Sequence, residues 1–284
     1  MQLFTQILAL VFVISTMLGV GLQLSVRDIS DSLHDRRWLL RALLANFVLL
    51  PALAFTIAHL LQLDAALTAG LLILATAPGG PVLLKLVRLA KGDTALTVGL
   101  LVILLIVGVI TQPLLLPLLL DNIHVSPLAI VLTLIFSVLL PLLAGLALRA
   151  RQAALAERLS NPAHKLSTLC MLLILIVLPT AHWQELVAIS SGNAIPAALL
   201  FLLLASVGGW LLGGPETGPR RVLSINCSQP NLAAAVVIAS QNFSDPQVVL
   251  MLLVIMLSSV PILLPLCLFY ARHPTATASQ IINR

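Results

Sequence analysis

The stretch Ala77-Pro78-Gly79-Gly80-Pro81-Val82-Leu83-Leu84-Lys85 interrupts an apolar segment at a depth where a membrane helix would normally run unbroken. A second interruption, Asn226-Cys227-Ser228-Gln229-Pro230-Asn231, lies far downstream in another apolar segment. In lipid, an unpaired backbone amide or carbonyl costs several kcal/mol unless protein or a water-filled cavity surrounds it. Two broken helices in matching positions are typical of the binding site of a secondary transporter.

The composition is that of a multi-pass membrane protein. Of the 284 residues, 60% are hydrophobic and 9% are charged, and the mean hydropathy is +1.12. Soluble domains are roughly 45–50% apolar and about 25% charged. The length leaves little room beyond membrane spans and short connections, so we expect no separate soluble domain.

Nine apolar segments reach about the 20 residues that a bilayer requires. They lie at 4–24, 39–61, 65–89, 95–120, 127–148, 166–187, 194–213, 222–243 and 247–271. The interrupted third and eighth segments run in opposite directions, which is the relation expected of inverted repeats. The sequence therefore predicts one all-α membrane domain over 1–284, with repeats at about 1–121 and 126–272 and a tail at 273–284.

The basic residues predict the orientation of the chain. All 15 Lys and Arg residues fall on one side of the nine segments, and the opposite loops carry none. Because cytoplasmic loops retain such residues, we expect the N-terminus outside, the C-terminus in the cytoplasm, and a plasma membrane of the bacterial inner-membrane type. The stretch 150–165 on the inner side fits either a short amphipathic helix on the membrane surface or a solvated loop.

The string Ala77-Pro78-Gly79-Gly80, followed by Leu89-Ala90-Lys91-Gly92-Asp93-Thr94-Ala95-Leu96-Thr97, resembles the proline-diglycine crossing helix and the segment after it in the bile acid:sodium symporter family. Stretches at 17–22, 45–51 and 220–233 are similar to further helices of that family, in the same order. The resemblance spans nearly the whole chain. It implies a core domain of crossing broken helices, a panel domain, and sodium-coupled uptake of organic anions by alternating access.

The chain departs from the family pattern where the resemblance implies sodium ligands. Sodium is a hard cation that needs several oxygen ligands. After the first diglycine the family typically has Thr-Ala-Ser-Asn, where this chain has Pro81-Val82-Leu83-Leu84. The family's Glu-Val-Gly-Met-Gln-Asn corresponds to 226–231, so that an amide replaces the carboxylate. These exchanges argue against sodium coupling of the usual kind.

The polar and backbone-exposing residues that remain at this depth form the candidate substrate- or ion-binding site. They are Asn46, Gly79, Gly80, Pro81, Lys85, Asn226, Ser228, Gln229, Pro230 and Asn231. The amides at 226, 229 and 231 either line the site or only cap the break. Lys85 either replaces the sodium charge beside an anionic substrate or snorkels to the cytoplasmic surface, because Lys91, six residues on, marks the membrane edge.

We expect a secondary transporter that moves a small organic anion or amphipathic solute, with that solute and the lipid bilayer as its partners. The alternatives are a sodium-independent carrier and a non-transporting membrane receptor or subunit with the same fold, and the oligomeric state stays open. No Ser/His/Asp arrangement or phosphate-binding loop supports an enzyme, and nothing indicates nucleic-acid binding. His59, His124 and His182 have no Cys or carboxylate at metal-ligand spacing. We expect no metal site and no cofactor; sodium is the one ion that the resemblance implies.

Overall fold

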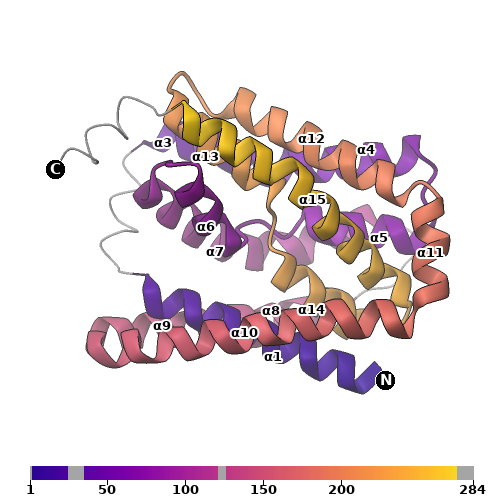
Figure 1. Ribbon diagram of the computed structural model, residues 1–284, viewed down its shortest axis with the longest axis horizontal. Coiled ribbons are helices and arrows are strands. Elements are labelled where there is room, and N and C mark those ends of the chain that lie inside the picture. Colours follow the sequence, from indigo (N-terminus) through magenta and orange to yellow (C-terminus); the bar gives the residue numbers. More distant parts are fainter. Residues whose placement is uncertain (1, 25–34, 121–125, 274–284) are drawn as a thin grey trace.

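The computed structural model describes residues 2–24, 35–120 and 126–273, and these form helices joined by short connections (Figure 1). Within them, eight helices are long and apolar enough to cross a membrane. The shorter apolar helix α5 (Ala65–Ala75) and helix α6 (Val82–Leu89) make up the third predicted span. The predicted all-α, multi-pass architecture is therefore confirmed. Arg27, Asp121, His124, Arg284 and the predicted tail from 274 on lie outside the described residues.

The remaining predicted spans correspond to single helices or to helical rods. The first is α1 (Gln2–Gln23), and the second joins α3 (Arg36–Leu44), η1 (Ala45–Leu49) and α4 (Leu50–Leu60). The fourth is α7 (Thr94–Leu119), and the fifth joins α8 (Pro127–Leu134), η2 (Ile135–Leu139) and α9 (Leu140–Arg151). The others are α10 (Ala153–Ala181), α12 (Ala194–Leu212), α13 (Thr217–Ser228) with α14 (Leu232–Asn242), and α15 (Pro246–Arg272).

Both predicted helix breaks are confirmed. α5 ends at Ala75 with Thr76 as its C-cap, and the chain resumes as a helix only after Pro81. α13 ends at Ser228, and α14 begins after Asn231, whose side chain accepts a hydrogen bond from the backbone N–H of Ala234. Of the window that spans α13 and α14, 89% is buried inside the protein, against 28–50% in the other spans. The second break is thus surrounded by protein, as unpaired backbone in a membrane requires.

Two π-helical segments, η1 and η2, interrupt the second and fifth spans. Each is followed by a proline, and the string Val-Leu-Leu-Pro occurs at both 48–51 and 138–141. Proline cannot donate the hydrogen bond of a regular helix turn, and a π-helical turn changes the local hydrogen-bond register around it. A proline alone does not produce such a segment, because Pro113 and Pro117 lie inside the regular helix α7; the two segments share the whole string that ends in the proline.

The stretch 150–165 is neither a separate surface helix nor a loop. Residues 150 and 151 end α9, and 153–165 form the first part of α10, which runs without interruption into the sixth span. Ala156, Ser160 and Ala163 are buried on one side of this part, and Gln23 at the end of α1 donates a hydrogen bond to the Ser160 hydroxyl at 3.0 Å. Because these small residues pack against α1, the helix is stabilised beyond the apolar segment that hydropathy identifies.

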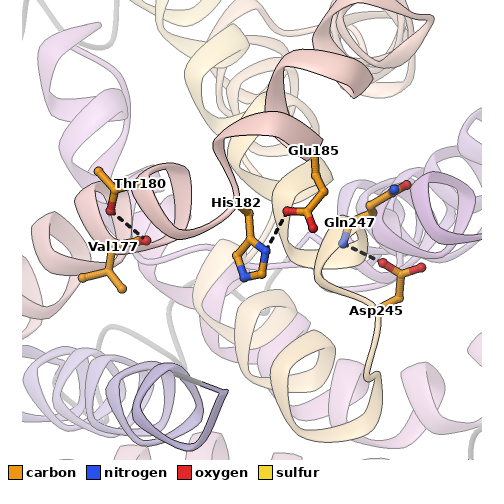
Figure 2. A network of polar contacts seen from close by, with 6 residues as sticks. All are labelled: Val177, Thr180, His182, Glu185, Asp245 and Gln247. Atoms are coloured by element: carbon orange, nitrogen blue, oxygen red, sulfur yellow. Dashed lines mark hydrogen bonds and ion pairs between the residues drawn. The ribbon is translucent and has the colours of Figure 1, made fainter.

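The sixth span also ends earlier than predicted, at Ala181, and a separate helix α11 (Trp183–Ser191) follows. His182 stands between the two helices, and its Nδ1 atom lies 2.7 Å from Glu185 Oε2. Figure 2 shows this pair together with Asp245, which accepts a hydrogen bond from the backbone N–H of Gln247 at the start of α15. His182 thus has a carboxylate partner, contrary to the prediction, but the described residues contain no group of three metal-ligating side chains.

The helices form two bundles. α1 packs along both α9 and α10, and these three helices lie together along the lower side of Figure 1. We call them, with α8 and η2, the panel bundle. The core bundle contains the two broken helices together with α3, η1, α4, α7, α12 and α15. In Figure 1, α5 and α14 lie toward one end of the molecule, and α6 and α13 toward the other, so the broken helices run in opposite directions.

Candidate functional site

The two breaks meet backbone to backbone. The N–H of Asn231 donates a hydrogen bond of 2.6 Å to the carbonyl oxygen of Ala77. A Cβ atom placed on Gly80 would lie 2.6 Å from the carbonyl oxygen of Pro230, which is closer than a side chain allows. Gly79 has φ +78°, a left-handed conformation that L-residues with a side chain adopt at a cost of about 1–2 kcal/mol. Glycine is therefore required at both positions for the helices to cross as they do.

A glutamine from a neighbouring helix holds the end of α5. Gln112 of α7 is 2% exposed, and its Nε2 atom donates hydrogen bonds to the carbonyl oxygen of Ile73 at 3.1 Å and to Thr76 Oγ1 at 3.3 Å. Thr76 Oγ1 in turn donates to the carbonyl of Leu72 at 2.8 Å. These bonds satisfy polar groups that the break would otherwise leave unpaired in the membrane.

Asn46 and Asn226 pair across the interior of the core bundle. Asn226 Nδ2 donates to Asn46 Oδ1 at 2.9 Å, and Asn46 Nδ2 donates to the carbonyl of Ala42 at 2.8 Å. Both side chains are buried, and Asn46 lies in the π-helical segment η1. The pair connects the second span to the second broken helix. Asn226 Oδ1 is buried and has no hydrogen-bond partner among the described residues.

Two other predicted site residues are engaged in local bonds. Ser228 Oγ donates to the carbonyl oxygens of Ser224 and Leu202 at 3.1 and 3.2 Å. Asn231 caps α14 through Ala234. These contacts satisfy the polar groups around the second break, which is the capping role that the sequence left open.

A cavity of about 470 Å³ lies beside the crossing, between the two bundles. The core bundle contributes α6, the second break, the start of α14 and α15, and the panel bundle contributes α1 and α10. Of the predicted site residues, Gly80, Pro81, Lys85, Gln229 and Pro230 line it. The residues that do not line it are Asn46, Gly79, Asn226, Ser228 and Asn231.

Five polar residues of the cavity, including Ser259 of α15, were not among the predicted site residues. Thr16 lies on α1, and His164, Ser167 and Thr168 lie on α10. His164 falls in the stretch 150–165, which hydropathy places outside the membrane. Hydroxyl residues such as Thr16 are common in membrane helices, so the presence of a threonine in the sequence did not indicate that it lines a cavity. The sequence signal that existed was a period of three to four residues in small and polar side chains along α10.

Lys85 lines the cavity with an exposed side chain. It is the only Lys, Arg, Asp or Glu among the residues that line it. The described part of the chain has one ion pair, between His182 and Glu185, so Lys85 has no carboxylate partner there. The cavity therefore carries an uncompensated positive charge.

The two half-helix N-termini differ. α14 is capped by the side chain of Asn231, whereas α6 has no side-chain cap at its start. Pro81 and Val82, at the start of α6, line the cavity. The positive end of the α6 dipole therefore faces the cavity, where it favours a negative charge.

Most buried side-chain oxygens around the crossing take part in hydrogen bonds. Of the buried side-chain oxygens in the described residues, Asn226 Oδ1 alone lacks a hydrogen-bond partner. No cluster of three His, Cys, Asp or Glu side chains occurs there either. The Ser228 hydroxyl only donates its hydrogen bonds and so keeps oxygen lone pairs, which are the ligands that a hard cation prefers.

Two discontinuous helices that cross inside a membrane domain, with a cavity beside the crossing, define a class of membrane transporters. A model of the Sodium Bile acid symporter family matches residues 10–189. This is more than half of the chain, which therefore belongs to that family. The family and the relatives described next are transporters, not enzymes.

Three relatives illustrate the similarity. The "Probable sodium/metabolite cotransporter BASS2, chloroplastic" of Oryza sativa subsp. japonica is 27% identical over 236 residues, which cover 82% of this chain and 56% of the relative. The "Probable sodium/metabolite cotransporter BASS1, chloroplastic" of Arabidopsis thaliana is 28% identical over 235 residues, which cover 81% and 58%. The "Uncharacterized sodium-dependent transporter YocS" of Bacillus subtilis (strain 168) is 24% identical over 239 residues, which cover 80% and 72%. The chain thus spans just over half the length of the two plant relatives.

Proposed function

We propose that this chain is a secondary transporter of a small organic anion or amphipathic solute, which it moves by alternating access of the core bundle relative to the panel bundle. The observation that carries the proposal is the cavity of about 470 Å³ between the bundles, which is largely apolar and has Lys85 as the one Lys, Arg, Asp or Glu residue of its lining. Cavities of roughly 300–1,000 Å³ suit small-molecule ligands. The family supports transport as the activity.

The site of this transporter comprises two sets of residues. Lys85 and Gln229 face the solute, with Gly80, Pro81 and Pro230 forming the wall at the crossing. The second set holds the crossing in place and consists of Asn46, Gly79, Asn226, Ser228 and Asn231. The crossing geometry depends on the second set, and solute binding on the first.

A sodium-independent carrier is the second candidate. The names of the plant relatives describe sodium/metabolite cotransporters, which supports sodium coupling. The departures from the family's sodium ligands at 81–84 and 226–231, and the position of Lys85 beside the break, support transport without it. We propose that the Lys85 ammonium group supplies the positive charge that a bound cation would bring.

The orientation and the repeats also remain proposals. We place the protein in a plasma membrane of the bacterial inner-membrane type, with the N-terminus outside and the C-terminus in the cytoplasm. The one-sided distribution of Lys and Arg supports this orientation. The opposite directions of the two broken helices support inverted repeats at about 1–121 and 126–272 (Figure 1).

Flux into proteoliposomes tests the function. Alkanesulfonates of two to eight carbons serve as probes, because their permanent charge keeps them from crossing lipid unaided. We expect counterflow of at least one sulfonate, at equal rates in sodium and choline buffers. A clear sodium requirement would reject the sodium-independent form but leave transport standing. Binding without flux would favour the non-transporting receptor or subunit, and the absence of both would reject the proposed function.

A further inference from the structure

Two arginine side chains meet at one glycine, away from the cavity. Gly214 follows the C-cap of α12, and a Cβ atom placed on it would lie 2.6 Å from Arg41 Nη1 of α3. Arg220 of α13 donates a hydrogen bond from its Nε atom to the carbonyl oxygen of Gly214. Helix α3 and the start of α13 lie at the same end of the core bundle (Figure 1). The fold thus brings two guanidinium groups together from separate helices.

The backbone of Gly214 suits this meeting point. Its φ of +92° is one that residues with a side chain rarely adopt. Because glycine has no side chain, the guanidinium group of Arg41 lies directly against the backbone of Gly214. Glycine at this position therefore serves both the sharp turn after α12 and the close approach of Arg41.

Two stacked aromatic rings hold Arg220 and its neighbour Arg221. The Cζ atom of Arg220 lies 5.7 Å from the centroid of the Trp210 ring, and that of Arg221 lies 5.1 Å from the centroid of the Tyr270 ring. The two rings stack on each other with their centroids 5.7 Å apart. A guanidinium group over a ring face keeps the N–H groups at its edge for other acceptors. Trp and Tyr gather at the membrane–water interface, which is the level of the lipid headgroups.

The positive charge at this point is not compensated within the described residues. The one ion pair there joins His182 to Glu185, so neither Arg41 nor Arg220 has a carboxylate partner. Glu216, four residues before Arg220, is exposed and forms no ion pair there either. Two guanidinium groups at one glycine repel each other. An anion that accepts hydrogen bonds from both would offset this repulsion.

Exposed apolar side chains continue from the two arginines along the surface of the core bundle. Leu44 and Val48 follow Arg41 by three and seven residues, so they share its side of the helix. An exposed row on α12 ends three residues before Gly214 and consists of Leu204, Val207 and Leu211. Helix α12 contacts both α3 and η1. This surface matches a molecule with an anionic group at the arginines and apolar chains along these rows.

We infer that Arg41 and Arg220 bind the phosphate of an anionic phospholipid, with its acyl chains along α3, η1 and α12. Basic pockets between membrane helices bind such headgroups in other membrane proteins. A free phosphate ion offers the same oxygens but has no apolar chains to place on the two rows. Neither arginine lines the cavity, so this inference does not depend on the proposed function. The bound lipid would link α3 to α13, the half-helix that leads into the second break.

Competition between two phospholipids for the purified full chain tests this inference. Dioleoylphosphatidylglycerol is anionic, and dioleoylphosphatidylcholine has the same acyl chains but no net charge. Both are supplied in equal amounts in detergent micelles, and the complexes are counted by native mass spectrometry. We expect the wild-type chain to prefer phosphatidylglycerol by roughly ten-fold or more, since each basic residue near a headgroup contributes about five-fold. Phosphatidylglycerol should also raise the unfolding temperature, whereas sodium phosphate at matched ionic strength should not.

The variants separate the two arginines from the general basic charge of the protein. Arg41→Gln and Arg220→Gln should each lower the preference for phosphatidylglycerol by about five-fold. Arg41→Lys keeps the charge and should retain most of the preference. Because Arg41 is exposed, Arg41→Gln should leave the unfolding temperature in lipid-free detergent unchanged. Arg151→Gln is the matched control, since Arg151 is also exposed but lies at the end of α9 in the panel bundle.

Three results would overturn the lipid site. The first is a preference that both Arg41→Gln and Arg220→Gln keep at the wild-type value. The second is an equal loss in Arg151→Gln, which would show that the charge acts diffusely. The third is stabilisation of the wild-type chain by sodium phosphate as strong as that by phosphatidylglycerol, which would assign the site to a free anion. Sulfonate flux by the wild-type chain would support the proposed function in each case, so the two failures can be told apart.

Discussion

Gly80 is the residue at which a single methyl group should disturb the site most. Its Cβ position lies 2.6 Å from the carbonyl oxygen of Pro230 and 3.0 Å from that of Gln229, and neither backbone oxygen can rotate away. We expect Gly80→Ala to destabilise the protein by about 1–3 kcal/mol, as overpacking of a tight interior does. Thermal unfolding in detergent and sulfonate flux measure the effect.

Gly218→Ala is the control for this substitution. Gly218 lies in α13, and a Cβ atom there would meet nothing within 4 Å. The added methyl group should leave the unfolding temperature unchanged or raise it slightly, because alanine favours a helix over glycine. Equal effects of the two substitutions would show that the crossing tolerates a side chain and would contradict the close contact described above.

Individual residues of the site were predictable where a polar or helix-breaking letter interrupts an apolar run. Gly80, Lys85 and Gln229 stand out in this way, and all three line the cavity. The pairing of Asn46 with Asn226 was not predictable, because 180 positions separate the two residues and only the fold brings them together. His164 was missed since hydropathy places it outside the membrane.

Helix α7 supports the broken helix α5 through one side chain. Gln112→Leu would remove both donated hydrogen bonds and leave the carbonyl of Ile73 without its partner from α7. We expect a loss of about 1–3 kcal/mol of stability. Thr111→Val is the matched control on the same helix, because Thr111 Oγ1 donates only to the carbonyl of Val107 in its own helix, at 3.0 Å. It should change stability by less than about 0.5 kcal/mol, and a thermal unfolding series compares the two.

The helices themselves were predictable to different degrees. The Pro-Gly-Gly-Pro string at 78–81 and Pro230 among polar residues identified the two breaks, because proline lacks the N–H of a helical hydrogen bond and glycine weakens a helix. A lone proline was not sufficient, since Pro113 and Pro117 lie inside α7. Hydropathy identified the spans but not the ends of the helices. The sixth apolar segment was predicted at 166–187, whereas the helix α10 begins at Ala153 and ends at Ala181. The π-helical segments were not predicted, although Pro51 and Pro141 mark them. A proline in a span is compatible with a kink as well as with a π-helical turn.

The orientation of the whole molecule can be tested by labelling from one side. Gln184 in α11 and Arg151 at the end of α9 are both exposed, and the proposed topology puts them on opposite sides of the membrane. We expect a membrane-impermeant maleimide to label Gln184→Cys in intact spheroplasts, and Arg151→Cys only after the membrane is opened. The three native cysteines are buried, so the unsubstituted chain is the background control. Labelling in the reverse order would invert the topology.

The arrangement of the bundles lay beyond sequence reasoning. Hydropathy shows that a helix lies in lipid but not which face it turns to its neighbours, since lipid and protein interior are similarly apolar. The cavity takes residues from α1, α6, α10, α14 and α15, and that combination follows only from the packing. The orientation, in contrast, could be predicted from the sequence. The Lys and Arg residues of each short loop favour the cytoplasmic side for that loop, whatever the packing of the helices.

The contact between Gly80 and Pro230 also has a mechanical consequence. Since the backbones of both breaks touch, and the Asn231 amide bonds the Ala77 carbonyl at 2.6 Å, neither half-helix can swing without pushing its counterpart. The four half-helices α5, α6, α13 and α14 therefore move as one rigid unit. Under the proposed alternating access, the solute path therefore opens by movement of the panel bundle relative to this unit, from which the cavity separates it.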